Sequence, residues 1–211
     1  MDESTEEVIT HRKEPAQSML TDAKLLTRLQ SGDAESFETL FLRHYDRVYG
    51  ILYRLLGNRA DAEDVAQQVF LKLYRRPHSV SLRKSDDSLS AWLYRVAVNT
   101  GYNALRGKTR RRKWYQVFSN QWDAEMPHPP TPADHSERAA TQSQVRQVLA
   151  LLKPRDAKLL LLRHSGLSYK ELAETLGVAP GSVGSLLSRA ERAFEKRYRS
   201  EFPAEEYPDG N

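Results

Sequence analysis

Apolar residues recur every three or four positions in two separate blocks of the chain, and neither block shows the alternation that is typical of strands. In the first block, Asp33 and Asp61 are placed to cap helices, and Gly57 and Pro77 are placed to end them. The pattern predicts a short first helix, which Thr21 or Asp22 caps and which ends near Gly32, and three longer helices over residues 34–56, 62–76 and 89–106. Four amphipathic helices without strands indicate one compact bundle.

A second periodic block begins near Ala139 and ends near Tyr198, after a stretch that cannot be helical throughout. That stretch contains Met-Pro-His-Pro-Pro-Thr-Pro, and each proline lacks an N–H and clashes with the preceding turn. Both ends of the chain are polar and lack periodicity, which is typical of disordered tails. We therefore expect an all-α protein of two small helical domains, 21–113 and 138–200, joined by a flexible Pro-containing linker over 114–137 and flanked by tails over 1–20 and 201–211.

The segment 167–189 carries the pattern of a helix-turn-helix. Ser168 and Glu171 have the spacing of a capping box, Gly177 suits the turn, and Pro180 suits the first turn of the second helix. A helix that lies in the major groove needs a small or polar outer face that becomes basic further on. The second helix offers there Ser182, Gly184, Ser185, Ser188, Arg189 and Arg192. A plain helical hairpin that binds no DNA has the same pattern and stays open as an alternative.

Basic residues crowd the end of the first block, over 106–113. They indicate a surface that grips phosphate, although a solvated helix end also attracts basic residues. The helix before them carries a mixed set that cannot all face one core: Trp92, Tyr94, Arg95, Asn99, Tyr102, Asn103 and Arg106. Exposed aromatic, amide and guanidinium groups suit stacking on unpaired bases and reading their edges. Trp92 is better explained as a core residue, whereas Asn99, Tyr102 and Asn103 are hard to explain by packing.

The composition excludes several classes of site. The formal net charge of +4 is too small to decide for a nucleic-acid partner by itself. The lack of cysteine excludes disulfides, thiolate zinc sites and a cysteine nucleophile. The six histidines form no metal pair at i, i+4 spacing, and the chain has neither a Gly-rich phosphate loop nor a Ser-centred elbow. We expect no catalytic residue, no metal and no cofactor, and hence no enzyme.

The chain also lacks the signals of membrane insertion and export. No apolar run approaches the roughly 20 residues that span a bilayer. The acidic, polar N-terminus has no apolar core of a secretory signal. We expect a cytoplasmic protein that does not insert into a membrane.

Three segments resemble the bacterial sigma factors, in the order and at the spacing of that family. DAEDVAQQVFLKLYRR (61–76) resembles the most recognisable helix of the family, and AWLYRVAVNTGYNALR (91–106) resembles the −10-element helix of its extracytoplasmic-function (ECF) group. The segment 151–194 resembles the −35-binding domain. The resemblance covers about 20–112 and 138–200, and it leaves no room for the two larger domains of primary sigma factors, which indicates the ECF group.

The resemblance implies three binding surfaces. Core RNA polymerase would bind Asp64, Gln67, Gln68, Phe70 and Leu71. The loop 78–90 and the helix 91–106 would open the −10 promoter element and capture a flipped base through Trp92, Arg95, Asn99, Tyr102, Asn103, Arg106, Lys108, Arg110 and Arg111, where Asn99 matches the asparagine of the family. The recognition helix 180–193 and the residues before it would read the −35 element as duplex through Ser168, Tyr169, Pro180, Gly181, Ser182, Ser185, Ser188, Arg189 and Arg192.

The resemblance also implies partners and a path for the linker. The linker 114–137 would thread through the polymerase toward the RNA exit path. An anti-sigma factor would hold the chain inactive, either by covering the polymerase-docking face near 65–74 or by wedging between the two domains. The catalytic magnesium would belong to the polymerase, so this chain needs none.

Three positions depart from the pattern of the family. Gln68 stands where an acidic residue is usual, and Gly184 and Leu186 stand where a Lys and an Arg are usual. These departures predict one weaker polymerase contact and an altered or weaker −35 preference. The alternative function is a dimeric helix-turn-helix regulator that binds operator DNA without polymerase; the proline linker and the two basic blocks argue against it.

Overall fold

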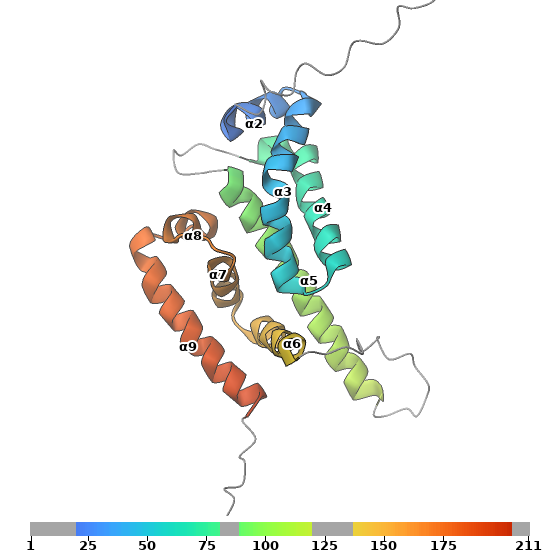
Figure 1. Cartoon of the computed structure of the whole chain (residues 1–211), viewed down its shortest axis with the longest axis vertical. Coiled ribbons are helices and arrows are strands. Elements are labelled where there is room, and N and C mark those ends of the chain that lie inside the picture. The colour runs from blue at the N-terminus through green and yellow to red at the C-terminus, as the bar shows by residue number, and fades with distance from the viewer. Residues whose placement is uncertain (1–19, 81–88, 120–136, 204–211) are drawn as a thin grey trace, which may run out of the picture.

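The computed structural model describes residues 20–80, 89–119 and 137–203, and the regular elements in these ranges are all helical (Figure 1). The α-helices are α2 (Asp22–Gln30), α3 (Ala34–Leu56), α4 (Arg59–Arg75), α5 (Leu89–Ser119), α6 (Glu137–Leu151), α7 (Pro154–His164), α8 (Tyr169–Leu176) and α9 (Val183–Glu201). Two 3₁₀ turns, η1 (Pro77–Ser79) and η2 (Pro180–Ser182), follow α4 and precede α9. The expected all-α class is confirmed. Residues 1–19 and 204–211 of the predicted tails, most of the loop 78–90 and part of the linker lie outside the described residues, and α9 ends at Glu201, one residue inside the predicted C-terminal tail.

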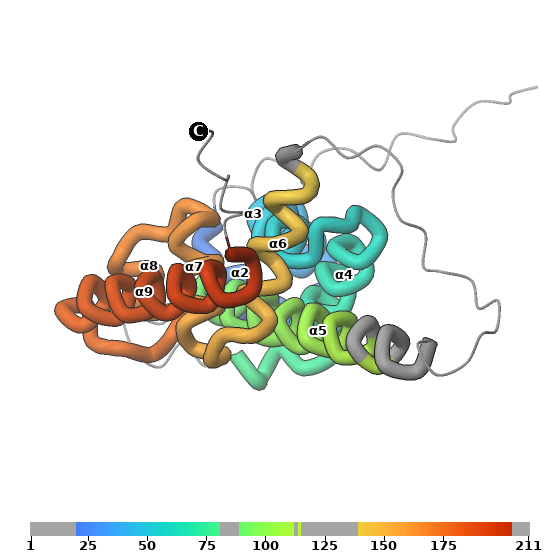
Figure 2. Tube along the Cα trace, turned by 90° about the horizontal axis from the view of Figure 1, so that it is seen from below, coloured from blue at the N-terminus to red at the C-terminus, as the bar shows by residue number. Residues whose placement is uncertain are grey.

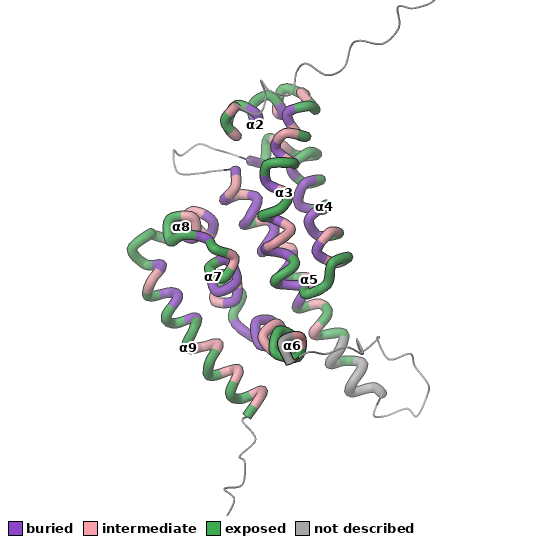
Figure 3. Tube along the Cα trace, in the orientation of Figure 1, coloured by how far each residue is buried: buried purple, intermediate pink, exposed green. Residues whose placement is uncertain are grey.

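Helices α2 to α5 form the expected first bundle, with their buried positions turned toward one another (Figure 3). The long α3 begins where the Asp33 side chain accepts a hydrogen bond from the Glu35 N–H, and it ends at Gly57 with φ of 67°. A residue with a side chain adopts this left-handed conformation only at a cost in free energy, which glycine avoids because it has no Cβ atom. Both ends of α3 therefore follow the sequence prediction.

The start of α4 differs from the prediction. The helix begins at Arg59, because the side chain of Asn58 accepts a hydrogen bond from the Asp61 N–H at 3.1 Å and acts as the cap. Asp61 lies inside the first turn, where its carboxylate forms an ion pair with Lys108 of α5. An asparagine caps as well as an aspartate, so the earlier of two nearby candidates begins the helix.

Helix α5 is longer than expected, because it continues past Arg106 to Ser119. The first residues assigned to the linker are therefore helical. Gly107 follows the expected end, but a single glycine costs only about 1 kcal/mol relative to alanine in a helix interior and does not stop the helix. Arginine and lysine, which follow it, are good helix formers and favour a helix C-terminal end.

The second block contains the predicted helix-turn-helix. Ser168 and Glu171 form a full capping box at the start of α8, and Gly177 ends α8 with φ of 65°. Pro180 opens the turn η2, and α9 follows from Val183, so the helix proper starts three residues later than the predicted 180–193. The buried side of α9 is Val183, Leu186, Leu187 and Ala190.

The two blocks are packed against each other. Helices α6, α7 and α8 each contact α5, and α7 and α8 lie on the opposite side of α5 from α4 (Figure 1). The buried apolar residues of both blocks belong to one continuous cluster, from Leu25 in α2 to Ala190 in α9. Contact clusters of this kind normally mark one core per domain. The two domains of the sequence prediction therefore share a core in this conformation.

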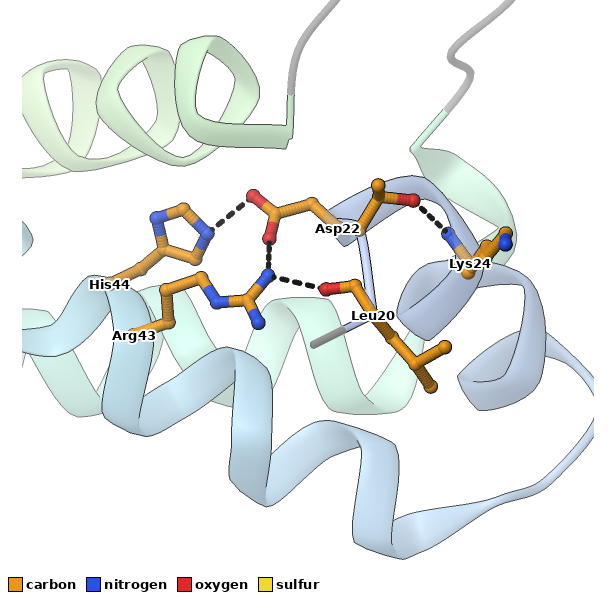
Figure 4. Close-up of polar contacts among 6 residues, drawn as sticks. Leu20, Asp22, Lys24, Arg43 and His44 are labelled. Atoms are coloured by element: carbon orange, nitrogen blue, oxygen red, sulfur yellow. Dashed lines mark hydrogen bonds and ion pairs between the residues drawn. The ribbon is translucent and has the colours of Figure 1, made fainter. Parts of the chain in front are cut away.

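A polar network fastens α2 to α3 (Figure 4). The Asp22 carboxylate accepts hydrogen bonds from Arg43 at 2.5 Å and contacts the His44 ring at 2.7 Å. Arg43 also donates to the Leu20 carbonyl at 3.0 Å. Burial acts to raise the pKa of Asp22, but the hydrogen bonds and charges of His44 and Arg43 outweigh it and leave that pKa below its ordinary value. The network therefore holds Asp22 as a carboxylate.

Candidate nucleic-acid interface

One face of α5 carries three of the predicted −10 residues, and this face meets the second block. Arg95, Asn99 and Tyr102 are spaced at i, i+4 and i+7, which places them along one side of a helix. The Arg95 guanidinium donates to the carbonyls of Thr175 and Glu174, both at 2.7 Å. These carbonyls belong to the last turn of α8, where a positive charge is favoured.

Tyr102 is the most deeply placed residue of the predicted −10 set. Its side chain is 2% exposed, and its hydroxyl donates to the Leu152 carbonyl at 2.8 Å, in the turn between α6 and α7. Burial raises the pKa of Tyr102, and the nearby Arg106 acts in the opposite direction. The residue was expected at an exposed surface, but in this conformation packing of the two blocks covers it.

Lys158 of α7 completes the contact with this face. Its ammonium donates to the Asn99 side-chain oxygen at 2.5 Å and lies 5.8 Å from the centre of the Tyr102 ring. Burial lowers the pKa of Lys158. Asn99 and Arg95 keep solvent exposure, but the Asn99 side-chain oxygen and the Arg95 guanidinium form hydrogen bonds with the second block.

The other predicted −10 residues lie outside this contact. Trp92 is half-buried against the apolar cluster, as the packing alternative predicted. Lys108 pairs with Asp61 of α4. The remaining residues of the predicted −10 set are exposed and lie toward the C-terminal half of α5: Asn103, Arg106, Arg110 and Arg111. These arginines form a basic surface that can contact phosphate.

The predicted −35 residues lie together on the outer side of the second block, and each is exposed: Ser168, Tyr169, Pro180, Gly181, Ser182, Ser185, Ser188, Arg189 and Arg192. Arg189 and Arg192 donate through Nε to the Ser185 and Ser188 carbonyls at 3.4 and 3.2 Å, so both guanidinium groups lie along α9. The helix presents the small face followed by a basic face that a major-groove reader needs.

The two departures on the recognition helix have a structural explanation. Leu186 is 7% exposed and belongs to the apolar cluster, so its position faces the core and not DNA. A Cβ on Gly184 would lie 3.8 Å from the Tyr169 ring, an ordinary contact, which leaves this position close to the outer face. Of the two positions, only that of Gly184 bears on the −35 contact.

The predicted polymerase-binding residues lie on α4. Asp64, Gln67, Gln68 and Leu71 are exposed, and Leu71 has an exposed fraction of 45%. Phe70 is 2% exposed, and its ring meets the Phe41 ring edge-on at 4.8 Å between centroids. Phe70 therefore supports this surface from the core, and the four exposed side chains form the surface itself.

Three basic residues that the sequence prediction did not single out lie between the blocks. Arg47 of α3 pairs with Glu171 of α8 at 3.3 Å and lies 5.5 Å from the centre of the Tyr94 ring. Arg146 of α6 packs over Gly57 at the end of α3. Lys158 is the third. Each occupies a polar position of its own helix, and helical spacing does not show what such a position touches.

The described part of the chain holds neither a membrane-spanning helix nor a metal-binding cluster. No helix there combines the length and the apolar character that crossing a membrane requires. The same residues contain no group of three or more His, Cys, Asp or Glu side chains that could hold a metal ion.

Known proteins match this chain along both blocks. The family model Sigma-70 region 2 matches residues 40–111, and Sigma-70, region 4 matches residues 142–194. The RNA polymerase sigma-H factor of Pseudomonas aeruginosa is 32% identical over 184 residues, which cover 83% of this chain and 92% of that protein. The ECF RNA polymerase sigma-E factor of Haemophilus influenzae is 32% identical over 186 residues, covering 84% of this chain and 95% of that protein.

A solved structure agrees with the fold. The structure of CnrH in complex with the cytosolic domain of CnrY matches with a TM-score of 0.53 at 19% identity. The match covers 86% of this chain and 99% of that one. At this identity the likeness supports the all-helical fold alone.

Proposed function

The chain belongs to the ECF sigma factors of bacteria, and from this membership we propose how its surfaces divide the steps of promoter opening. As a sigma factor, it directs core RNA polymerase to promoters. The assignment of each step to residues is our proposal. The observation that carries it is that α4, α5 and α9 each keep exposed polar or basic residues, although Tyr102 of α5 is buried in the apolar cluster in this conformation.

The α5 face captures the −10 element as single-stranded DNA. Unstacking a base pair costs about 1–2 kcal/mol per step, so melting needs groups that bind the unpaired bases. Asn99 offers an amide that can read a base edge, and Tyr102 offers a ring for stacking. Arg106, Arg110 and Arg111 continue along the same helix as phosphate contacts.

The recognition helix α9 reads the −35 element as duplex. Ser182, Ser185 and Ser188 are short enough to let the helix approach the major-groove floor. Arg189 and Arg192 lie further along the same face and contact phosphate or base edges. Ser168 and Tyr169 sit at the N-terminus of α8, where backbone N–H groups favour phosphate.

The exposed α4 residues dock on core polymerase. Asp64, Gln67 and Gln68 supply polar contacts around Leu71, which is the apolar centre of the face. Exposed polar residues around an apolar side chain are the usual composition of a protein interface. The polymerase supplies the nucleotidyl-transfer chemistry, so we assign this chain no catalytic residue, no metal and no cofactor, and we place it in the cytoplasm with the polymerase.

Run-off transcription tests the assignment to α5. Purified chain and core polymerase are incubated with a library of promoters, and wild type is compared with Asn99→Ala. We expect promoter-dependent transcripts from wild type and a large loss in Asn99→Ala. Glu38→Ala, an exposed change on α3, is the control that keeps wild-type transcription. Equal transcription by Asn99→Ala and wild type would remove Asn99 from the −10 contact.

A gel shift separates the proposal from the operator-binding alternative. A dimeric regulator binds its site by itself, whereas a sigma factor binds promoter DNA well only after core polymerase is added. We expect a stable shift of a selected promoter fragment only in the presence of the core enzyme. The two family models, which match regions of sigma factors in both blocks, do not favour the regulator.

An anti-sigma factor is the further partner that ECF membership supports. We propose that it covers the α4 face, where Leu71 and Tyr74 are 45% and 49% exposed, or that it wedges between the two blocks. An apolar segment of such a partner would bury these two side chains, which otherwise face water. Affinity purification of the tagged chain from unstressed cells should recover a second protein besides polymerase. Recovery of polymerase alone would contradict this part of the proposal.

A further inference from the structure

A groove with an apolar floor and a basic rim runs between α7 and α9. Figure 2 shows α9 lying along α7, with the C-terminal end of α9 beside α6. Leu152 and Leu186 form the floor together with Leu151 and Ala193. The rim carries five basic side chains and one acidic side chain: Lys153, Arg155, Arg189, Lys196, Arg197 and Asp156. This combination suits an acidic peptide segment that also brings an apolar side chain.

The basic side chains of the rim have few acidic partners of their own. Lys153, Arg155 and Lys196 form no ion pair within the part of the chain that the structure describes. Arg197 pairs with Glu201 at 2.9 Å, but its Nε is buried and has no acceptor among the same residues. A buried donor without an acceptor costs free energy, and a carboxylate is the acceptor that a guanidinium binds best. The groove therefore has unmatched positive charge and an unmatched donor.

The segment 204–211, which follows α9 and lies outside the described residues, has the matching chemistry. It reads AEEYPDGN, with three carboxylates, one aromatic side chain and no basic residue. Eight extended residues reach at most about 29 Å. Arg189, at the far end of the groove, is twelve residues before Glu201, which is about 18 Å along a helix. The segment is therefore long enough to return along α9 as far as Arg189.

We propose that the acidic segment 204–211 binds in the groove between α7 and α9 of its own chain, with its carboxylates on the basic rim and Tyr207 on the apolar floor. Arg189 is both a rim residue and a −35 residue, so the segment competes with DNA phosphate for it. This competition rests on the proposed function of α9. Because phosphate contacts carry no sequence information, the competition weakens binding to every duplex alike.

Paramagnetic broadening of amide signals tests where the acidic segment binds. The chain has no native cysteine, so Asn211→Cys places a nitroxide label at one position of the full chain. At low salt we expect broadened signals from Lys153 and Lys196 in the groove and sharp signals from Asp64 on α4. Salt at about 0.5 M should reduce the broadening, because it screens the charges of the rim and the segment. Sharp signals from the groove at low salt would overturn the proposal.

Two sets of substitutions separate the acidic segment from a general effect of charge. The neutralised variant replaces the three acids of the segment: Glu205→Gln, Glu206→Gln and Asp209→Asn. The control removes three acids ahead of α2: Glu3→Gln, Glu6→Gln and Glu7→Gln. The neutralised variant should lose the broadening and the control should keep it, and equal loss in both would contradict the proposal. Broadening between separately labelled chains in a mixed sample would show contact with a second copy and would overturn binding within one chain.

Fluorescence anisotropy with a duplex of random sequence tests the competition with DNA, without polymerase. At low salt the neutralised variant should bind about threefold more tightly than wild type, and the control should match wild type. In an Arg189→Ala background this gain should shrink. Equal affinities of the neutralised variant and wild type, or an undiminished gain in the Arg189→Ala background, would overturn the competition at Arg189. Lack of promoter-dependent transcripts from wild type with core polymerase would instead overturn the proposed function and leave the binding in the groove intact.

Discussion

The Tyr102 hydroxyl of α5 lies 2.8 Å from the Leu152 carbonyl oxygen in the turn between α6 and α7, and the tyrosine is 2% exposed. One residue therefore joins a helix of the first block to a turn of the second. The hydroxyl and the ring have separable roles. The hydroxyl makes the contact between the blocks, and the ring is the part that we propose to stack on a base.

Tyr102→Phe should separate these two roles. Loss of the hydroxyl leaves the Leu152 carbonyl without its donor, and we expect the free energy of unfolding to fall by about 1 kcal/mol. Because the ring remains, run-off transcription should stay close to that of wild type, whereas Tyr102→Ala should lose most of it. Urea unfolding and transcription on one promoter measure the two effects. Equal transcription by the Phe and Ala variants would contradict a stacking role for the ring.

Asp22→Asn should weaken the joint between α2 and α3 at neutral pH. We expect a loss of about 1 kcal/mol in the free energy of unfolding, because Arg43 and His44 lose a charged partner. The folded-state pKa of Asp22 lies below its ordinary value of 3.8, so the carboxylate stabilises the fold fully above that value. The stabilisation is lost as the pH falls through the lower, folded-state pKa.

Urea unfolding as a function of pH measures this difference. Wild type and Asp22→Asn should differ at pH 7 and converge in acid, once Asp22 is protonated in the folded chain as well. Asp46→Asn, an exposed change on α3, is the control and should match wild type at each pH. A difference between wild type and Asp22→Asn that persists in strong acid would argue against the charged network.

Ser168→Ala should destabilise the helix-turn-helix. The Ser168 hydroxyl accepts a hydrogen bond from the Glu171 N–H at 3.3 Å, and the Glu171 carboxylate accepts one from the Ser168 N–H at 2.7 Å. Loss of a cap of this kind costs about 1 kcal/mol. Ser168→Asp retains a capping side chain and should keep most of the stability. Amide exchange in α8 should therefore accelerate in the Ala variant and change less in the Asp variant.

Two glycines of α5 should respond in opposite directions to a side chain. A Cβ on Gly101 would lie 2.7 Å from Leu52 Cδ2 and 2.9 Å from Leu55 Cδ2, so α3 approaches α5 closely there. Gly101→Val should cost about 1–3 kcal/mol by overpacking. A Cβ on Gly107 would meet no neighbouring helix within 4 Å among the described residues, and Gly107→Ala should stabilise α5 by up to about 1 kcal/mol. Thermal unfolding of both variants measures this contrast.

Much of the fold is predictable from local signals. Asp33, Ser168 and Gly177 act at the helix ends where the sequence placed them. Errors occurred where two local signals compete at small energy differences. Asn58 and Asp61 are both good caps, and the helix α5 passes Gly107 because its neighbours are strong helix formers. When two local signals differ by only about 1 kcal/mol, the packing of the surrounding residues decides which of them sets the helix end.

The sequence by itself determined the helical class, the two blocks, the helix-turn-helix and the resemblance to ECF sigma factors, because each depends on spacing within a short segment. Only the tertiary structure decided that Arg95, Asn99 and Tyr102 face the second block, and that Arg47 and Lys158 form polar contacts between the two blocks. Helical periodicity reports which side of a helix is apolar. It does not report which of several polar sides meets a segment that lies 50 or more residues away along the chain, as Tyr102 meets Leu152. That choice depends on how whole helices pack.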